Sequence, residues 1–355
     1  MSAVPAPPRC ATARPAAPRT WLLLGEKPGD NAQVRVVADA LGWPCETRTL
    51  RMKPQWVLGK PPVRPSLAHV DLARSDALEP PWPDLLLTAG RRLSSAALWV
   101  KRASDDRTKL VLIGKPRRWM HRFDLVVAAA QYRMGAHPNV VRIGLPLMRV
   151  DPAAVAEAAG DAGRFEGLPR PLLALLVGGP TKALRFDARV ARDVATRARR
   201  DAEAAGGSLF VCASRRTSPP LVDALAGALP ASTPLYRWQA GDASNPYLPL
   251  LAAADRFAVT SDSVSMMVEI ARLGRPLAIA RLPARRARLR AVTRSRDLDA
   301  VARVLLAQGL ASELGAPWRT PAGPLEDDVA SVVARVRALV GEAPTAASAA
   351  GAAAT

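Results

Sequence analysis

Short apolar runs recur along the chain, and many of them are followed by a glycine or a small polar turn and then by apolar residues at helical spacing. The run at 21–24 ends in Gly25, for example, and the run at 172–177 ends in Gly178 and Gly179. Strands that alternate with helical stretches predict a parallel sheet with helices on both faces. The order therefore predicts an α/β fold of the doubly wound type. Expected strands lie at 21–24, 46–50, from 84 onward, 109–113, 124–128, 139–143, 172–177, 209–213, 235–238, 257–260 and 276–280.

The length favours two domains, because 355 residues exceed one ordinary core, and 49% hydrophobic residues suffice to fill both. A polar, Ala- and Gly-rich stretch divides two similar halves. We expect these segments: a disordered extension at 1–19, a first Rossmann-like domain at 20–150, a connector at 151–170, a second Rossmann-like domain at 171–310, a C-terminal loop and helix at 311–341 and a disordered tail at 342–355.

The formal charge of +19 would ordinarily favour nucleic acid or an anionic membrane as a partner. Only seven of the 50 basic residues are Lys, however, and Ala, Arg and Pro are abundant throughout, which is typical of genome-wide codon bias. Aromatic residues make up 5% of the chain, so stacking platforms are scarce, and no nucleic-acid-binding module is recognisable. We expect no specific nucleic-acid partner.

The three cysteines have no metal-ligand spacing and leave an odd count, which is typical of reduced thiols in the cytoplasm. No apolar run approaches the roughly 18 residues needed to span a bilayer, and the first residues lack the apolar core of a signal peptide. These features predict a cytoplasmic protein with no metal and no resident cofactor.

The strongest site signal is the polar turn after the strand at 257–260. Thr260, Ser261, Asp262 and Ser263 lead into an apolar helical pattern, and the last three can cap that helix. The N–H groups behind the cap would form an anion site, aided by the helix dipole. Glu269, about two turns into the helix, would reach the hydroxyls of a bound sugar. The alternative is an ordinary strand-to-helix junction with a solvated Glu.

Two further strand ends in the second half carry groups suited to phosphate. Gly178 and Gly179 would let backbone N–H groups approach a diphosphate. Ser214, Arg215 and Arg216 would supply charge-assisted donors to phosphate oxygens. One such turn is common, but three in a single half indicate a common anion site.

The first half carries weaker signals. Gly90 and Arg91 follow a strand and would lie at the functional edge, although a turn with solvated arginines explains them equally well. The segment after the first strand is neither a GxGxxG nor a Walker loop. We place Asp30 in this loop, facing the cleft between the domains, as a candidate general base.

Arg281 to Arg296 hold seven arginines and no acid. Such a run usually forms a solvated face of the protein. The functional alternative is contact with an anionic membrane surface or with an acidic acceptor.

Several of these motifs together resemble the bacterial relatives of the plant mitochondrial-fission (elongated-mitochondria) protein family. The resemblance covers roughly residues 20 to 285 and lies at 25–33, 90–92, 139–141, 178–180, 214–217, 245–247, 259–269 and 274–276. That family is similar in turn to GT-B glycosyltransferases and to nucleotide-sugar epimerases, which have two Rossmann-type domains facing across a cleft. The resemblance implies a nucleotide-sugar diphosphate in the second domain, with Glu269 on the ribose hydroxyls, and an acceptor bound from the first domain.

Two departures from the family pattern leave the base open. Asp30 stands where the family often has a His, and residues 128–132 lack an expected Pro and His-Asp pair. The leading hypothesis is a metal-independent glycosyltransferase that uses a nucleotide sugar and acts on an unknown acceptor, either free or membrane-associated. The alternatives are a non-catalytic adaptor that recruits a partner to a membrane, peripheral at its surface, and a nucleotide-sugar epimerase.

Overall fold

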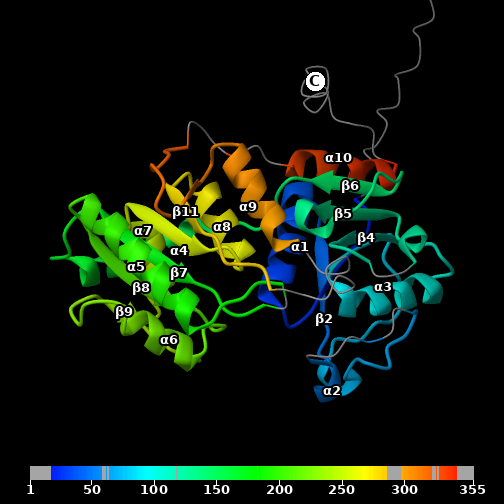
Figure 1. Ribbon diagram of the computed structural model, residues 1–355. Coiled ribbons are helices and arrows are strands. Elements are labelled where there is room, and N and C mark those ends of the chain that lie inside the picture. The colour runs from blue at the N-terminus through cyan, green and yellow to red at the C-terminus, as the bar shows by residue number, and fades with distance from the viewer. Residues whose placement is uncertain are drawn as a thin grey trace, which may run out of the picture.

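The chain forms two six-stranded sheets in which every paired strand is parallel (Figure 1). This computed structural model describes residues 17–57, 61, 64–116, 119–181, 183–285, 297–321, 325 and 328–341. Each sheet has helices on both faces, which confirms the predicted α/β architecture of two Rossmann-type units with parallel sheets.

The first sheet has the strand order β2-β1-β3-β4-β5-β6. Its strands are β1 (Thr20–Leu24), β2 (Cys45–Thr49), β3 (Leu85–Ala89), β4 (Lys109–Ile113), β5 (Leu125–Ala129) and β6 (Val140–Ile143). Its helices are α1 (Pro28–Leu41), α2 (Pro54–Val57) and α3 (Arg91–Ala103), with 3-10 turns at Leu72–Arg74, Met120–Arg122 and Ala130–Tyr132. Because successive side chains of a strand point to opposite faces, one set packs under α1 and the other under α3.

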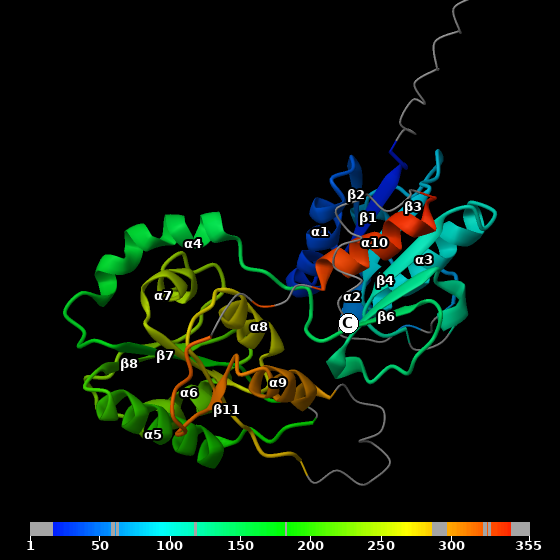
Figure 2. The same ribbon diagram turned by 90° about the horizontal axis from the view of Figure 1, so that it is seen from above.

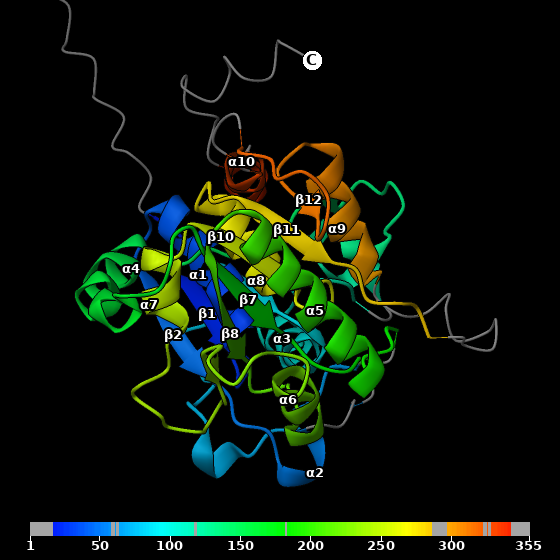
Figure 3. The same cartoon turned by 60° about the vertical axis from the view of Figure 1, so that its left-hand side comes forward.

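The second sheet has the order β12-β11-β10-β7-β8-β9. Its strands are β7 (Leu172–Val177), β8 (Ser208–Ala213), β9 (Leu235–Tyr236), β10 (Arg256–Thr260), β11 (Leu277–Ala280) and β12 (Ser312–Glu313). Its helices are α5 (Ala188–Ala204), α6 (Pro219–Ala226), α7 (Tyr247–Ala253), α8 (Val264–Arg272) and α9 (Leu298–Ala307). Helices α5 and α6 cover one face, and α7, α8 and α9 cover the other (Figure 3).

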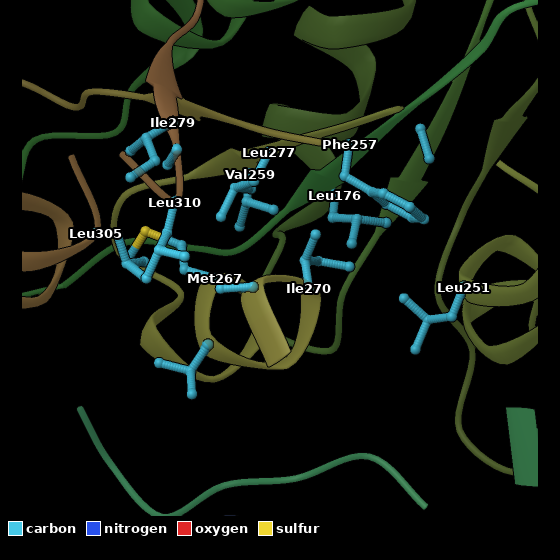
Figure 4. Packing of buried hydrophobic residues seen from close by; sticks show 14 of the residues in the cluster. Leu176, Leu251, Phe257, Val259, Met267, Ile270, Leu277, Ile279, Leu305 and Leu310 are labelled. Carbon is cyan, nitrogen blue, oxygen red and sulfur yellow. The ribbon is translucent and has the colours of Figure 1, made fainter. Parts of the chain in front are cut away.

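The face under α8 holds the largest of the hydrophobic clusters. Met267 and Ile270 of α8 pack against Phe257 and Val259 of β10 and Leu176 of β7, all of them fully buried (Figure 4). Burial of apolar side chains of this size contributes roughly 1.5 to 3 kcal/mol each. The core therefore fixes the position of α8 relative to the ends of β7 and β10.

The connector between the units contains α4 (Pro152–Ala158) and a 3-10 segment at Ala159–Phe165. Asp151 caps α4 by accepting a hydrogen bond from the N–H of Ala153 at 2.9 Å. The last described helix, α10 (Val329–Leu339), returns to the first unit and packs beside α1 (Figure 2). Arg337 fixes it by donating to the carbonyl of Leu41 at 2.7 Å.

Several boundaries differ from the prediction. Helix α1 begins at Pro28, inside the segment predicted as a loop, because proline favours the first turn of a helix. Helix α6 and strand β12 were not predicted, and β12 extends the second sheet beyond residue 310. Within the predicted C-terminal loop and helix at 311–341, helix α10 begins at Val329. None of the helices within the described ranges is long and apolar enough to cross a membrane.

An ion-pair network links the two units. Asp297, at the start of α9, accepts from Arg133 of the first unit and from Arg303 at 2.7 Å. Its N–H also donates to the carbonyl of Gln131 at 2.9 Å. Burial alone would raise the pKa of Asp297, but Arg303 and Arg133 outweigh it, so the pKa is lowered. Asp297 is thus held ionised at the contact between the units.

The Asp297→Asn variant tests this contact. The pKa of Asp297 in the folded state lies below its unfolded value of about 3.9. The ionised carboxylate therefore stabilises the fold above about pH 3.9, and this stabilisation is lost as the pH falls through the folded-state pKa. We expect the variant to lose on the order of 1 kcal/mol at neutral pH in urea unfolding, with the difference from wild type shrinking below about pH 4.

The control is Asp223→Asn, which removes an exposed ion pair with Arg237 inside the second unit. We expect Asp223→Asn to lower the free energy of unfolding by less than about 0.5 kcal/mol. If the difference in unfolding free energy between wild type and Asp297→Asn does not change with pH, the stabilising role of the Asp297 carboxylate is contradicted.

Candidate functional site

The strand order creates a switch point in each sheet. In the second sheet β8 and β10 lie on opposite sides of β7, so the connections after β7 and β10 leave in opposite directions. Ligands of open α/β sheets bind in the crevice outside the carboxyl ends of such strands. Gly178 follows β7 and Ser261 follows β10, which places two of the three predicted turns at this point. In the first sheet the switch point lies between β1 and β3, and these two strands are followed by Gly25 and Gly90.

The polar turn after β10 joins neighbouring strand ends. Thr260 accepts from the N–H of Gly178 at 2.8 Å, and Asp262 accepts from the N–H of Gly179 at 2.8 Å. The hydroxyl of Ser261 accepts from the N–H of Leu282, just beyond β11, at 3.0 Å. All three polar side chains are buried, and a buried N–H group left unpaired would be costly. The turn therefore holds the carboxyl edge of the sheet together.

The expectation that Gly178 and Gly179 offer N–H groups to a diphosphate is wrong for this structure, because Thr260 and Asp262 already accept from them. The glycines are required for close packing. A Cβ on Gly178 would lie 2.2 Å from the Asp262 Oδ2 atom, and one on Gly179 would lie 2.0 Å from the carbonyl oxygen of Arg216.

Arg216 is also engaged within the protein. Its guanidinium lies 2.8 Å from Asp262 Oδ2, and the Asp262 side chain is fully buried. Burial raises the pKa of Asp262, while Arg216 and the N–H of Gly179 act in the opposite direction. Ser214 is fixed by Thr217, whose hydroxyl accepts from the Ser214 N–H at 2.9 Å. Thr217 itself was missed as a site residue, although it completes the Ser-Arg-Arg-Thr motif.

Arg215 is exposed like Arg216, but it differs from Arg216 because no described acidic group forms an ion pair with it. The amino end of α8 is buried, but no side chain caps it. Ser263 occupies the N-cap position, but its side chain makes no capping bond, and the first turn contains no acid, so the predicted side-chain cap is wrong. By contrast, Asp187 caps α5 through the N–H of Val190 at 3.0 Å. An uncapped helix start favours an anion.

Glu269 lies on α8 and is half-buried. The hydroxyl of Tyr247, at the start of α7, donates to Glu269 Oε2. Burial raises the pKa of Glu269, and the hydrogen bond from Tyr247 opposes that shift. The carboxylate is therefore held by a neighbouring helix instead of being solvated.

The first unit brings Asp30 and Gly90 together. Asp30 lies in the first turn of α1, so its predicted place in a loop is wrong. Its Oδ2 atom would be 2.7 Å from a Cβ on Gly90, whose φ of +81° also favours glycine. Arg91 begins α3 directly after Gly90. Asn31 was missed: it pairs with both backbone groups of Gly25, at 3.0 and 2.6 Å, and so fixes the end of β1.

The three histidines contribute to neither switch point. His69 is buried against the carbonyl of Arg92 at 2.8 Å, and His121 and His137 are exposed. Within the described residues, no cluster of three or more His, Cys, Asp or Glu side chains could hold a metal ion. Arg281 lies 2.8 Å from Asp299, so it is engaged within the protein. The predicted arginine run beyond residue 285 lies outside the described residues.

A protein-family model described as Mitochondrial fission ELM1 matches residues 28–338. The chain belongs to this family. It is 28% identical over 231 residues to the mitochondrial fission protein ELM1 of Arabidopsis thaliana, which covers 59% of this chain and 53% of the plant protein. The chain thus spans about half the length of that relative. It is 24% identical over 296 residues to the uncharacterized protein RP120 of Rickettsia prowazekii (strain Madrid E), and the match covers 73% of this chain and 82% of RP120.

Solved structures with a related arrangement include nucleotide-sugar enzymes. The S. aureus MnaA-UDP co-structure has a TM-score of 0.48 and 12% identity, with 92% of this chain and 99% of that chain covered. UDP-GlcNAc 2-epimerase from Neisseria meningitidis bound to UDP-GlcNAc also has a TM-score of 0.48 and 12% identity, with 90% of this chain and 99% of that chain covered. MurG of Acinetobacter baumannii has a TM-score of 0.45 and 14% identity, with 83% of this chain and 85% of that chain covered. Similarities at this level give no information on activity.

The packing at the switch point predicts a strong effect of Gly179→Ala. The added Cβ would meet the backbone of Arg216, so the two strand ends must separate, and we expect a loss of about 2 kcal/mol or more in urea unfolding. The matched control is Gly135→Ala, where an added Cβ meets nothing within 4 Å. It should leave stability unchanged or raise it slightly. Equal effects of the two substitutions would contradict this account.

Proposed function

We propose that this member of the family binds a nucleotide-sugar diphosphate at the carboxyl ends of β7 and β10 and transfers the sugar to an acceptor bound by the first unit. The observation that carries the proposal is the uncapped amino end of α8 at the switch point of the second sheet, where Arg216, the sequence neighbour of the exposed Arg215, pairs with Asp262. Helix N–H groups and an arginine together suit a diphosphate.

The residues around this point receive distinct roles in the proposal. The amino end of α8 and Arg215 stabilise the leaving diphosphate by electrostatics, so no metal is needed. Glu269 accepts hydrogen bonds from the ribose hydroxyls. Asp262 and Arg216 support the turn from which α8 starts.

The transfer step uses the first unit. An acceptor hydroxyl attacks the anomeric carbon of the sugar, the bond from that carbon to the diphosphate oxygen breaks, and the diphosphate leaves with the electron pair. Asp30, held beside Gly90 at the other switch point, takes the proton of the hydroxyl.

Calorimetric titration of the purified protein with UDP-, GDP-, CMP- and ADP-sugars tests the donor site. Binding of one class at micromolar to millimolar concentration is expected, and no binding of any class at millimolar ligand contradicts the proposal. Conversion of the bound sugar without an acceptor would instead favour the epimerase alternative.

Arg215→Ala should weaken binding of the donor by about tenfold or more, because a charge-assisted hydrogen bond to phosphate contributes about 1.5 to 3 kcal/mol. The control is Arg192→Ala, which removes an equally exposed positive charge on α5. An equal loss in the two variants would mean that overall charge, and not a local contact, attracts the nucleotide.

A second candidate is an adaptor without catalytic activity that recruits a protein partner to a membrane, and the arginine-rich run favours it. The arginine run from Arg281 to Arg296 would contact anionic lipid. Flotation with anionic and with neutral liposomes tests it. We expect Arg285, Arg286 and Arg288 changed together to Ala to reduce flotation with the anionic liposomes, and flotation equal to that of wild type contradicts the adaptor.

A further inference from the structure

The Asn245-Pro246-Tyr247 motif has no role in the function proposed above, although the structure places it next to Glu269. Pro246 is the N-cap of α7, and Asn245 Oδ1 accepts from the N–H of Tyr247 at 3.0 Å. The motif therefore sets the start of the helix and the place from which the Tyr247 side chain extends.

The core fixes α7 relative to α8. Leu250 and Leu251 of α7 belong to the same buried cluster as Met267 and Ile270 of α8. The hydroxyl of Tyr247 donates to Glu269 Oε2 across this contact. A buried tyrosine hydroxyl needs a partner, and the carboxylate supplies it. Two helices joined by apolar packing thus hold one oxygen of Glu269 in place.

The hydrogen bond also acts on the charge of Glu269. Burial raises the pKa of Glu269 above its ordinary value, and the hydrogen bond from Tyr247 opposes this rise without cancelling it, so the bond itself favours the ionised form. An ionised carboxylate only accepts hydrogen bonds and has about four acceptor positions. Among the described residues no donor to Oε1 is found, and Oε1 is not one of the fully buried atoms without a partner, so it can accept from solvent or from a ligand.

We propose that Tyr247 is a positioning residue that holds Glu269 for recognition of the ribose hydroxyls of a nucleotide. The inference rests on the proposed function and names the residue that makes the carboxylate selective for ribose. A phenylalanine would preserve the packing of Tyr247, so only the hydroxyl carries this role.

The test compares the affinities of ribonucleotides and deoxynucleotides. UDP, GDP, CDP and ADP, each with its 2′-deoxy and 3′-deoxy counterparts, are titrated into wild type and into Tyr247→Phe. For the nucleotide that binds, wild type should prefer the ribose form over at least one deoxy form by about tenfold, the magnitude of one charged hydrogen bond. Tyr247→Phe should weaken only the ribose form, so that the ratio falls toward one.

The matched control is Tyr236→Phe, which removes another hydroxyl in the same unit that donates to a carboxylate, Asp242 Oδ2, at 2.9 Å. This variant should keep the wild-type ratio. A purely structural loss in either variant would weaken both nucleotide forms equally and leave the ratio unchanged.

Four outcomes decide between the possibilities. A wild-type ratio retained by folded Tyr247→Phe overturns the inference and leaves the proposed function standing, whereas no binding of any nucleotide to folded wild type overturns both. Glu269→Gln gives a second measurement if Tyr247→Phe does not fold. A ratio unchanged by Glu269→Gln overturns the inference as well, and a fall in the ratio supports it.

Discussion

The buried carboxylate of Asp262 is the interaction on which the second unit's functional edge depends. It accepts from Gly179 after β7 and from Arg216 after β8, and it stands at the end of β10. One side chain thus joins three strand ends that are far apart in the sequence. An ionised group in such a position is stabilised only while these donors remain, so the positions of the strand ends and the charge state of Asp262 depend on each other.

The α/β class and most strands follow from the sequence, because apolar runs separated by helical patterns have few other solutions. The apolar residues 172–177 of β7 and 257–259 of β10 are all buried, and Arg256 and Thr260 mark the two ends of the β10 run. The short elements were missed. Strand β12 is only two residues long, and α6 starts with two prolines, which read as a loop.

The candidate site could be located from the sequence but its internal bonding could not. Glycines and small polar residues at strand ends predict the edge, since the carboxyl ends of parallel strands meet there. Which side chain accepts from which N–H depends on strand order, and the sequence does not show that β10 lies beside β7. For this reason Gly178 and Gly179 were interpreted as ligand donors, when the chain's own Thr260 and Asp262 accept from them.

The return of α10 to the first unit has a consequence for biosynthesis. One apolar face of the first sheet is covered by α1 together with Val329, Val332 and Val336 of α10, which are among the last described residues. Domains generally fold in the order in which the ribosome releases them. Here the unit that is made first cannot cover this apolar face fully until α10 has been synthesised. During translation that face is exposed, and the second unit has its whole sequence outside the ribosome before the first unit is finished.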